Sequence, residues 1–446
     1  METFDKNYIY HFVGIKGTGM SALALVLHGE GYTVQGSDVS TYYFTQQGIE
    51  SAGIKVMEFN PDNIEDGQFI IAGNAFGDDH PEIQRAKALD IPMKRYHEFL
   101  GELIGNYTSI AVTGSHGKTS TTGLLSHVLR NLSPTSYLIG DGTGYGDPSA
   151  KYFALEACEY RRHFLAYQPD FAIITNVDFD HPDYYQSIED VFEAIQVFAN
   201  QVKKGLIICG EDDYLHDLDV NVPMYAYGFS KEDYVSASNI ERTTEGSSFD
   251  VYMDGGYLGR FSTPVFGKHN ILNTLAVITF MSLEGFDAMA INEALATYGG
   301  VKRRFSTREL SGLTIIDDYA HHPSEIKATI DAAHQKYPDR EIIAVFQPHT
   351  FSRTVALLNE FANALSIADK VFLVDIFTSA REQEGDISIE DLANLVVGVA
   401  EIISQDHLSP LLTIEDAVVI FMGAGDIDKL SKHFENIYSQ QRANKF

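Results

Sequence analysis

The chain contains little cysteine and little positive charge, and each shortage excludes a class of protein. Two cysteines among 446 residues cannot form a disulfide scaffold, and they fit the reducing cytoplasm. Lys and Arg number 32 against 62 Asp and Glu, a net charge of −30, so the surface repels nucleic acid and anionic membranes. We therefore expect phosphate groups to bind only where cations gather locally, as at Lys302-Arg303-Arg304.

Long hydrophobic runs are also missing. No run approaches the roughly 20 apolar residues that span a bilayer, and residues 1–7 lack the basic and apolar segments of a signal peptide. We expect a cytoplasmic protein with small-molecule partners, no nucleic-acid or membrane partner, and a monomeric or weakly dimeric state. The length of 446 residues predicts about three domains.

Apolar strand patterns alternate with helix patterns along the chain, and this alternation predicts parallel sheets of the α/β class. A strand at Tyr8–Ile15 and a helix at Gly19–Gly29 begin the series. Short alternating segments within residues 223–265 instead predict a small antiparallel sheet. We expect three domains: a Rossmann-like parallel sheet at 1–105, a P-loop ATPase-like α/β domain with the antiparallel sheet at 106–305, and a Rossmann-like α/β domain at 306–446.

The most specific motif follows an apolar run at Tyr107–Val112 and precedes a helical run that starts at Thr119. It reads Ala111-Val-Thr-Gly-Ser-His-Gly-Lys-Thr-Ser120, with two residues between its glycines instead of the usual four. Glycines let backbone amides face an anion, the helix N-terminus adds partial positive charge, and the lysine adds a full charge. The motif predicts a nucleoside triphosphate site made by Gly114, Ser115, His116, Gly117, Lys118, Thr119 and Ser120.

A second glycine loop lies between the first strand and the first helix. It reads Gly14-Ile-Lys-Gly-Thr-Gly-Met-Ser21, and Asp38 follows the second expected strand, where a ribose-binding acid belongs. NAD and a uridine sugar nucleotide carry the same pyrophosphate, so the loop is compatible with either ligand. Tight packing of a helix on a strand would need similar glycines. No companion domain for hydride transfer is recognisable, which favours the sugar nucleotide.

Candidate metal ligands follow later strands. Glu156 ends one apolar run, and His181 follows the next. The carboxyl ends of parallel strands meet at one edge of a sheet, so we expect these groups to converge on Thr119. Mg²⁺ prefers oxygen ligands, which Thr119 and Glu156 supply, while Glu159 competes with Glu156 for this role. Cys158 has no base at a telling spacing, and we expect it to be a small buried side chain.

Polar side chains also gather in the second half of the chain. Asn270 and Asn273 lie three positions apart, so on a helix they share a face that suits reading a purine edge. Residues 316–325 read Ile-Asp-Asp-Tyr-Ala-His-His-Pro-Ser-Glu, which predicts a strand that ends before a helix begins at Pro323. Two carboxylates, a tyrosine and two histidines so close together are costly to bury in a core. We therefore expect a functional site there.

In their order these motifs resemble those of the Mur ligase family, ATP-dependent enzymes that form amide bonds in cell-wall synthesis. The resemblance covers essentially the whole chain. It implies that ATP phosphorylates the lactyl carboxylate of UDP-N-acetylmuramate, that an amino acid attacks the acyl phosphate, and that Mg²⁺ is needed. The adjacent His321-His322-Pro323 resembles the type that adds L-alanine.

The resemblance also implies roles for individual residues. Catalytic roles fall to Lys118, His181, Arg304 and His321, and metal binding to Thr119, Glu156 and His181. Beyond the P-loop, ATP would contact Asn176, His269, Asn270, Asn273, Arg304, Asp318 and Tyr319. The sugar nucleotide would contact Gly14, Lys16, Gly17, Thr18, Gly19, Met20, Ser21, Asp38, Asn74 and His97. The amino acid would contact His321, Arg353 and Arg381, although many relatives carry an arginine where this chain has Thr350.

Three alternatives stay open. A family member that adds another amino acid, or recycles wall peptides, would differ in the amine that it accepts. A P-loop binding or motor protein would hydrolyse ATP without UDP-N-acetylmuramate. An NAD-linked oxidoreductase would bind nicotinamide at the first glycine loop.

Overall fold

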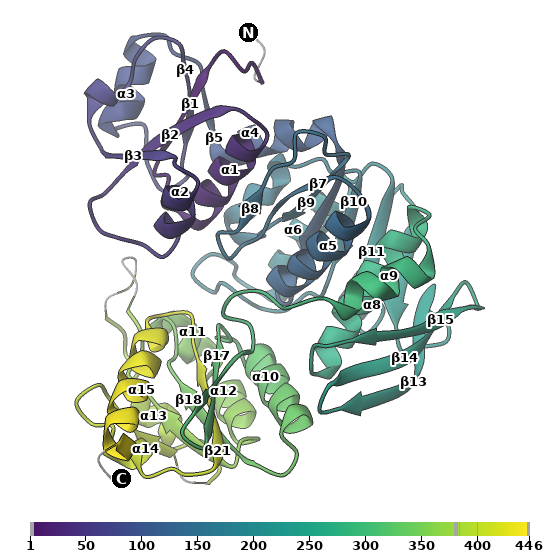
Figure 1. The fold of residues 1–446 in the computed structure, drawn as a ribbon, viewed down its shortest axis with the longest axis vertical. Helices are drawn as coiled ribbons and strands as arrows, with labels where there is room; N and C mark the ends of the chain where they lie inside the picture. Colours follow the sequence, from purple (N-terminus) through teal and green to yellow (C-terminus); the bar gives the residue numbers. More distant parts are fainter. Residues whose placement is uncertain (1–3, 379–381, 383, 399, 444–446) are drawn as a thin grey trace.

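Three α/β bodies make up the structure, a computed structural model that describes residues 4–378, 382, 384–398 and 400–443. In Figure 1 the N-terminal body lies at the top left, the central body at the right and the C-terminal body below. Three separate sheets, each largely parallel, confirm the predicted fold class. Among the described residues, no helix is long and apolar enough to cross a membrane.

The N-terminal body is a five-stranded parallel sheet with the order β3-β2-β1-β4-β5. The chain runs outward from β1 in one direction and then returns to β4 on its other side, and ligands bind at such a switch point. Its strands are β1 (Ile9–Val13), β2 (Thr33–Asp38), β3 (Lys55–Glu58), β4 (Gln68–Ala72) and β5 (Met93–Arg95). Its helices are α1 (Thr18–Gly29), α2 (Gln46–Ser51), α3 (Pro81–Ala88) and α4 (Tyr96–Leu103), with short 3₁₀ turns at Pro61–Asn63 and Ile104–Asn106.

The central body is a ten-stranded sheet with the order β15-β14-β13-β12-β11-β10-β6-β9-β7-β8. Strands β10 and β11 are fully buried apolar runs, as parallel strands covered on both faces should be. Its parallel part contains β6 (Thr108–Thr113), β7 (Thr135–Leu138), β9 (Tyr152–Glu156), β10 (Phe171–Ile174), β11 (Gly205–Cys209) and β12 (Met224–Gly228), with β8 (Gly144–Tyr145) antiparallel to β7. Its helices are α5 (Lys118–Leu132), α6 (Ile188–Ala199), α7 (Asp213–His216), α8 (Lys268–Leu283) and α9 (Ala288–Ala296), with a 3₁₀ segment at Tyr160–Ala166.

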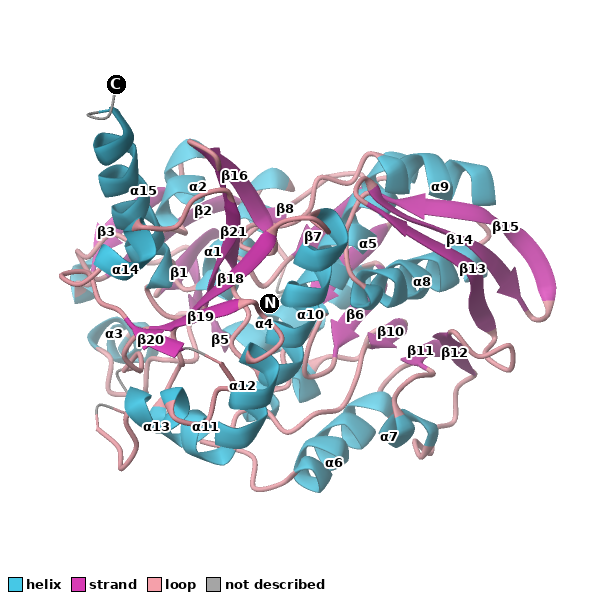
Figure 2. Ribbon diagram, turned by 90° about the horizontal axis from the view of Figure 1, so that it is seen from below, coloured by secondary structure: helices cyan, strands magenta, loops and turns pink. Residues whose placement is uncertain are grey.

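The predicted antiparallel strands are present, and they extend the central sheet. They are β13 (Val235–Thr243), β14 (Gly246–Met253) and β15 (Gly256–Thr263). Strand β13 pairs in parallel with the last two residues of β12, Tyr227 and Gly228, and so continues the sheet. Figure 2 shows these strands projecting past the parallel part, with α9 lying along them.

The C-terminal body is a six-stranded sheet with the order β16-β17-β21-β18-β19-β20. Only β16 runs antiparallel to its neighbour. The strands are β16 (Ser306–Leu310), β17 (Leu313–Asp318), β18 (Glu341–Phe346), β19 (Lys370–Leu373), β20 (Ala400–Ile402) and β21 (Ala417–Met422). The helices are α10 (Pro323–Lys336), α11 (Phe351–Ala356), α12 (Leu358–Leu365), α13 (Ile389–Ala393), α14 (Ser409–Leu412) and α15 (Ile427–Ala443).

The C-terminal body is docked on the central one. Arg242 on β13 lies 2.7 Å from the carboxylate of Asp331 on α10. Gln335 on the same helix donates to the carbonyl of Gly246 at 2.9 Å. Helix α10 begins at Pro323, as the sequence predicts, because His322 caps it by accepting the Ser324 N–H. The carboxyl ends of β17 and of the central strands therefore face one cleft.

Candidate active site

The P-loop joins β6 to α5 with the backbone that a phosphate-binding turn requires. Gly114 and Gly117 have φ angles of +121° and +80°, which favour glycine. A Cβ on Gly114 would overlap Oγ1 of Thr175, so a larger residue would force the loop apart. Gly117 is the N-cap of α5, and the N-terminal amides of that helix therefore face the loop.

Asn176 holds the P-loop from the end of the neighbouring strand. Its Oδ1 accepts the His116 N–H at 2.8 Å, and its Nδ2 donates to the His116 carbonyl at 3.0 Å. Oγ of Ser115 donates to the Asp178 carbonyl at 2.9 Å. These bonds fix the loop on a rigid strand end, as a precise binding site needs.

Lys118 places a full positive charge at the loop. Its Nζ donates to the carbonyls of Gly114 and Ser115 at 2.6 and 2.9 Å and lies 2.9 Å from Oε2 of Glu159. Burial disfavours the ammonium, but Glu159 outweighs it, so the pKa of Lys118 is raised. Burial likewise opposes the charged form of Glu159, yet Lys118 and His181 hold its pKa below the ordinary value.

Two carboxylates near the loop have different partners. Glu156, at the end of β9, interacts with the Thr119 hydroxyl, and its Oε2 accepts the Gly140 N–H at 2.9 Å. Oε1 of Glu159 lies 3.5 Å from Nε2 of His181. The structure therefore joins Thr119 to Glu156, and His181 to Glu159.

This donor set fits Mg²⁺. Hydroxyl and carboxylate oxygens are its preferred ligands, usually completed by substrate phosphates and water. Burial raises the pKa of Glu156, and a bound cation would favour its charged form. Thr119 and Glu156 could hold one ion, whereas Glu159 and His181 form a separate pair beside Lys118.

A cavity of about 760 Å³ opens between the P-loop, α8 and the C-terminal body. Its size is that of a small-molecule site. Nδ2 of Asn273 donates to Oδ1 of Asn270 at 3.1 Å, so the two amides share a helix face, as their spacing predicts. Burial lowers the pKa of His269 to about 4, so its imidazole is neutral. Nine predicted nucleotide contacts line the cavity: His116, Gly117, Ser120, Asn176, His269, Asn270, Asn273, Arg304 and Asp318.

The C-terminal body supplies the far wall of this cavity. Nη1 of Arg304 lies 3.4 Å from Oε1 of Glu325. Asp318 accepts the N–H groups of Phe305 and Ala320, both at 2.8 Å, and burial raises its pKa to about 6. Tyr319, a predicted adenine contact, does not line the cavity. Its ring instead lies against Arg304, whose Cζ is 5.4 Å from the ring centre.

Two of the residues predicted to contact the amino acid, His321 and Arg353, each lie against a carboxylate. Nδ1 of His321 lies 3.1 Å from Oε2 of Glu325. Arg353 is buried, and its Nε and Nη2 donate to Oδ1 of Asp180 at 3.1 and 2.6 Å. Its guanidinium therefore ties the C-terminal body to the central one. Arg381 lies outside the described residues.

The N-terminal glycine loop is held by its own polar side chains. Gly14 has a φ of +85°, which favours glycine. Asp38 accepts the Lys16 N–H at 2.7 Å, and Nζ of Lys16 donates to the carbonyls of Val39 and Thr41 at 2.7 and 2.9 Å. Asp38 thus fixes the loop and is buried. The other predicted loop contacts lie at the N-terminus of α1: Gly17, Thr18, Gly19, Met20 and Ser21.

His97 and Asn74, two further residues predicted to contact the sugar nucleotide, lie next to each other, and His163 lies beside them without having been predicted. Nδ1 of His97 lies 2.9 Å from Oδ1 of Asn74. The ring centre of His163 lies 4.8 Å from that of His97. Arg161 and Arg162 have φ angles of +55° and +59°. Such angles cost energy in residues other than glycine, and residues strained in this way cluster at functional sites. The central body therefore reaches the N-terminal site, a contact that no sequence motif signalled.

Cys158 is exposed, and the prediction of a small buried side chain is wrong. It follows the end of β9, where the chain leaves the core and Glu159 turns inward to meet Lys118. The thiol lies within 4.8 Å of ligand atoms of Glu159 and His181.

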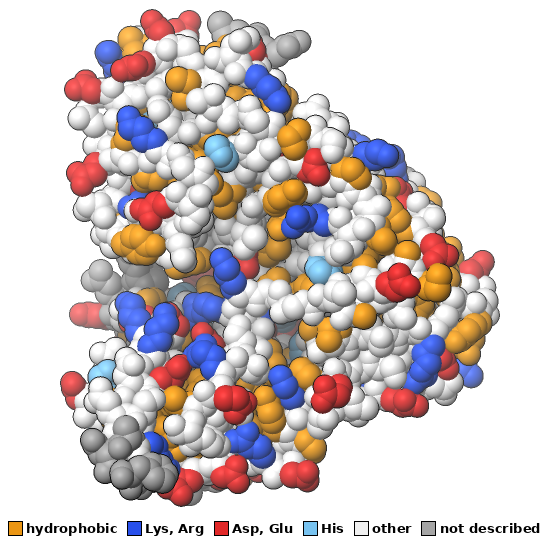
Figure 3. Space-filling model, viewed as in Figure 1, with side chains coloured by type: hydrophobic (Ala, Val, Ile, Leu, Met, Phe, Trp, Pro, Cys, Tyr) orange, Lys and Arg blue, Asp and Glu red, His pale blue; other side chains and the backbone are white. Residues whose placement is uncertain are grey.

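The surface is hollowed between the N-terminal and C-terminal bodies, and several Lys and Arg side chains lie along the lower side of the hollow (Figure 3). Three family models match successive parts of the chain: "Mur ligase family, catalytic domain" at residues 9–108, "Mur ligase middle domain" at 112–281 and "Mur ligase, glutamate ligase domain" at 303–425. The chain belongs to the Mur ligase family.

Curated relatives extend this Mur ligase match over almost the whole chain. The UDP-N-acetylmuramate--L-alanine ligase of Levilactobacillus brevis is 59% identical over 435 residues, covering 98% of each chain. That of Lactiplantibacillus plantarum is 58% identical over 432 residues, covering 97% of this chain and 99% of the relative. The crystal structure of the UDP-N-acetylmuramate-alanine ligase of Thermotoga maritima has a TM-score of 0.79 at 28% identity, covering 97% of this chain and 99% of that one.

Several polar residues of this Mur ligase site had no predicted role. Glu325 contacts both Arg304 and His321, and its place at the end of the motif at 316–325 was the only available signal. Asp178 and Asp180 follow β10 and contact the C-terminal body. Nothing in their sequence spacing distinguishes them from a solvated acidic loop.

Proposed function

We propose that this Mur ligase adds L-alanine to UDP-N-acetylmuramate at the expense of ATP. One observation supports the proposal: His116 and Gly117 of the P-loop line the same cavity as Arg304 and Asp318, and the charge of Arg304 acts on Glu156 beside Thr119. A phosphoryl donor and an amine could therefore act on one acceptor carboxylate there. Relatives of 58–59% identity carry the same activity in their names.

The proposed reaction has two steps. The γ-phosphoryl group of ATP passes to the lactyl carboxylate, which gives an acyl phosphate and ADP. The neutral amine of L-alanine then attacks the acyl carbon, a tetrahedral intermediate loses phosphate, and a proton is released as the amide forms. Activation is required because a carboxylate is a poor electrophile, and positioning with charge neutralisation supplies most of the catalysis of phosphoryl transfer.

Specific side chains perform these steps. Lys118 and Arg304 neutralise the charge on the transferring phosphoryl group, a role worth ~10²–10³ in turnover per donor in comparable sites. Bound Mg²⁺ supplies further charge neutralisation there, and Thr119 and Glu156 would hold it. His321, fixed by Glu325, orients the amine.

The N-terminal and C-terminal domains have the remaining roles in the proposed reaction. The sugar nucleotide binds along the carboxyl edge of the N-terminal sheet, at the glycine loop and His97. The C-terminal domain closes on ATP and keeps water from the acyl phosphate. The small soluble substrates place the reaction in the cytoplasm, and the chain acts as a monomer or weak homodimer.

Phosphate release by the full chain tests this function. With ATP, Mg²⁺ and UDP-N-acetylmuramate, we expect release with L-alanine to exceed release with glycine, L-serine or a wall tripeptide. Preference for the tripeptide would indicate a recycling ligase. Equal ATP hydrolysis without the sugar nucleotide would indicate a P-loop protein of another kind, and tight NAD binding would favour the oxidoreductase.

A further inference from the structure

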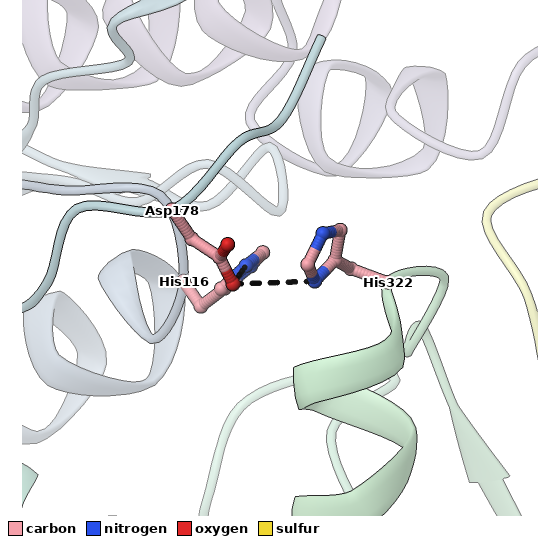
Figure 4. A group of neighbouring side chains, drawn as sticks. All are labelled: His116, Asp178 and His322. Carbon is pink, nitrogen blue, oxygen red and sulfur yellow. Dashed lines mark hydrogen bonds and ion pairs between the residues drawn. The ribbon is translucent and has the colours of Figure 1, made fainter. Parts of the chain in front are cut away.

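The side chain of His116 leaves the P-loop and contacts the C-terminal body (Figure 4). Its ring centre lies 4.2 Å from that of His322, the N-cap of α10, with the two planes at 31°. Nε2 of His116 lies 3.2 Å from Oδ2 of Asp178, on the loop after β10, and its Nδ1 lies 3.8 Å from Oε1 of Glu325 on α10. Each ring nitrogen therefore faces a different carboxylate, one in each body.

These two carboxylates favour the charged form of the His116 ring. Burial opposes the imidazolium, but the bonds to Asp178 and Glu325 outweigh burial and raise the pKa of His116 to about 9. Burial likewise opposes ionised Glu325, but His321, His116 and Arg304 hold its pKa well below the ordinary value. At pH 7 the ring is therefore an imidazolium, which donates from both of its nitrogens.

Glu325 connects this ring to the two groups that act on the phosphate and on the amine in the proposed reaction. Its Oε1, which faces His116, also lies 3.4 Å from Nη1 of Arg304. Its Oε2 accepts the His321 N–H at 3.0 Å and lies 3.1 Å from Nδ1 of the same residue. One oxygen of the carboxylate thus serves the phosphate side of the site, and the other serves the amine side.

The backbone of His116 is anchored independently of its ring. Asn176 accepts the His116 N–H and donates to the His116 carbonyl, at 2.8 and 3.0 Å. Oγ1 of Thr175 donates to the same carbonyl at 2.5 Å. A change of the ring should therefore leave the course of the P-loop unchanged, so the effects of the ring and of the loop backbone can be measured separately.

We propose that His116 is a positioning residue that couples the P-loop to the amino-acid half of the site through Glu325. This inference rests on the proposed function, to which the roles of Arg304 and His321 belong. The ring fixes Oε1 of Glu325, so that Oε2 stays aimed at His321, which orients the amine. When the C-terminal body is not docked on the P-loop this contact is absent, and the orientation of His321 is no longer fixed from that side.

Two substitutions of His116 in the full chain, each of which keeps one donor, test this coupling. Glutamine places its amide nitrogen near the position of Nε2 of histidine, and asparagine places its own near Nδ1. His116→Gln therefore keeps the donor to Asp178, whereas His116→Asn keeps the donor to Glu325. The measured quantities are kcat/KM for L-alanine and, by calorimetry, the Kd of a non-hydrolysable ATP analogue.

We expect His116→Gln to lose roughly tenfold or more in kcat/KM for L-alanine, as loss of a hydrogen bond to a charged group implies, and His116→Asn to lose less. Both variants should bind the ATP analogue nearly as the wild type does, because the backbone bonds to Asn176 remain. His433→Gln, which alters an exposed histidine on α15, should match the wild type in both measurements.

A double-mutant cycle with Glu325→Gln separates positioning from a general loss of stability. If His116 acts through Glu325, the two losses are not additive, and the double variant is little worse than Glu325→Gln alone. Additive losses, a greater loss in His116→Asn than in His116→Gln, or an equal loss of affinity for the ATP analogue would overturn the proposal. A wild type that ligates no amine would instead refute the proposed function, whereas ligation by the wild type with unchanged kinetics in His116→Gln would refute the coupling alone.

Discussion

Removing the charge of Lys118 should abolish turnover while leaving the fold intact. The ammonium touches two P-loop carbonyls and Glu159, and the acidic surface offers no replacement cation. Loss of one such charge stabiliser costs ~10²–10³ in kcat, about 2.7–4 kcal/mol of transition-state stabilisation. We expect Lys118→Ala to lose at least this much in ATP-dependent phosphate release.

The same substitution has a second, pH-dependent effect on stability. Glu159 is 1% exposed and keeps a contact with His181 when Lys118 is removed. Removing the opposite charge from a buried ion pair costs about 3–5 kcal/mol. The charges of Lys118 and His181 hold the pKa of Glu159 in the folded state below its ordinary value of 4.5. The stabilisation that ionised Glu159 gives to the folded state is therefore present above pH 4.5 and is lost as the pH falls below that value. The destabilisation by Lys118→Ala should therefore be larger at pH 7 than at pH 4.

Steady-state phosphate release and thermal unfolding at both pH values measure these effects. Lys204→Ala is the matched control, because this lysine lies in the same body, is 53% exposed and pairs with Asp170. It should change neither measurement appreciably. Turnover of Lys118→Ala within a few-fold of the wild type, with unchanged ATP dependence, would refute the P-loop assignment.

Three further predictions concern the metal, the pH profile and the docking of the domains. Glu156→Gln should raise the Mg²⁺ concentration for half-maximal activity more than Glu159→Gln does, and the reverse ranking would place the ion beside Glu159. Burial raises the pKa of Asp318 to about 6, so if its charge is needed, activity should fall as the pH drops through that value. Asp318→Asn, assayed for residual activity, should lack this limb. Asp180→Asn should weaken the buried bond to Arg353 and enlarge the radius of gyration in small-angle scattering, whereas an unchanged radius would show that this ion pair does not hold the closed arrangement.

Strand positions were predictable because buried parallel strands are continuous apolar runs. Strands β11 (Gly205–Cys209) and β21 (Ala417–Met422) are such runs, and β18 (Glu341–Phe346) is one after its first residue. The start of α10 at Pro323 was equally clear. The parallel joining of β13 to β12 was not predictable, because local alternation does not encode which strand a segment pairs with or in which direction.

Individual side-chain environments were harder to predict than motifs. The P-loop fixes its own geometry through Gly114 and Gly117, so its form followed from sequence. The exposure of Cys158 depends on where β9 ends and how Glu159 turns toward Lys118. The pairing of Arg353 with Asp180 joins residues from two bodies, which sequence spacing cannot reveal.

Oxygen transfer from substrate to phosphate tests the central claim most directly. UDP-N-acetylmuramate labelled with ¹⁸O in its lactyl carboxylate would be incubated with ATP, Mg²⁺, L-alanine and the full chain. Acyl-phosphate chemistry predicts one ¹⁸O atom in each phosphate released and the alanine amide as the other labelled product. Release of unlabelled phosphate, with the carboxylate recovered unchanged, would show that ATP is hydrolysed by water and that the chain does not perform the proposed ligation.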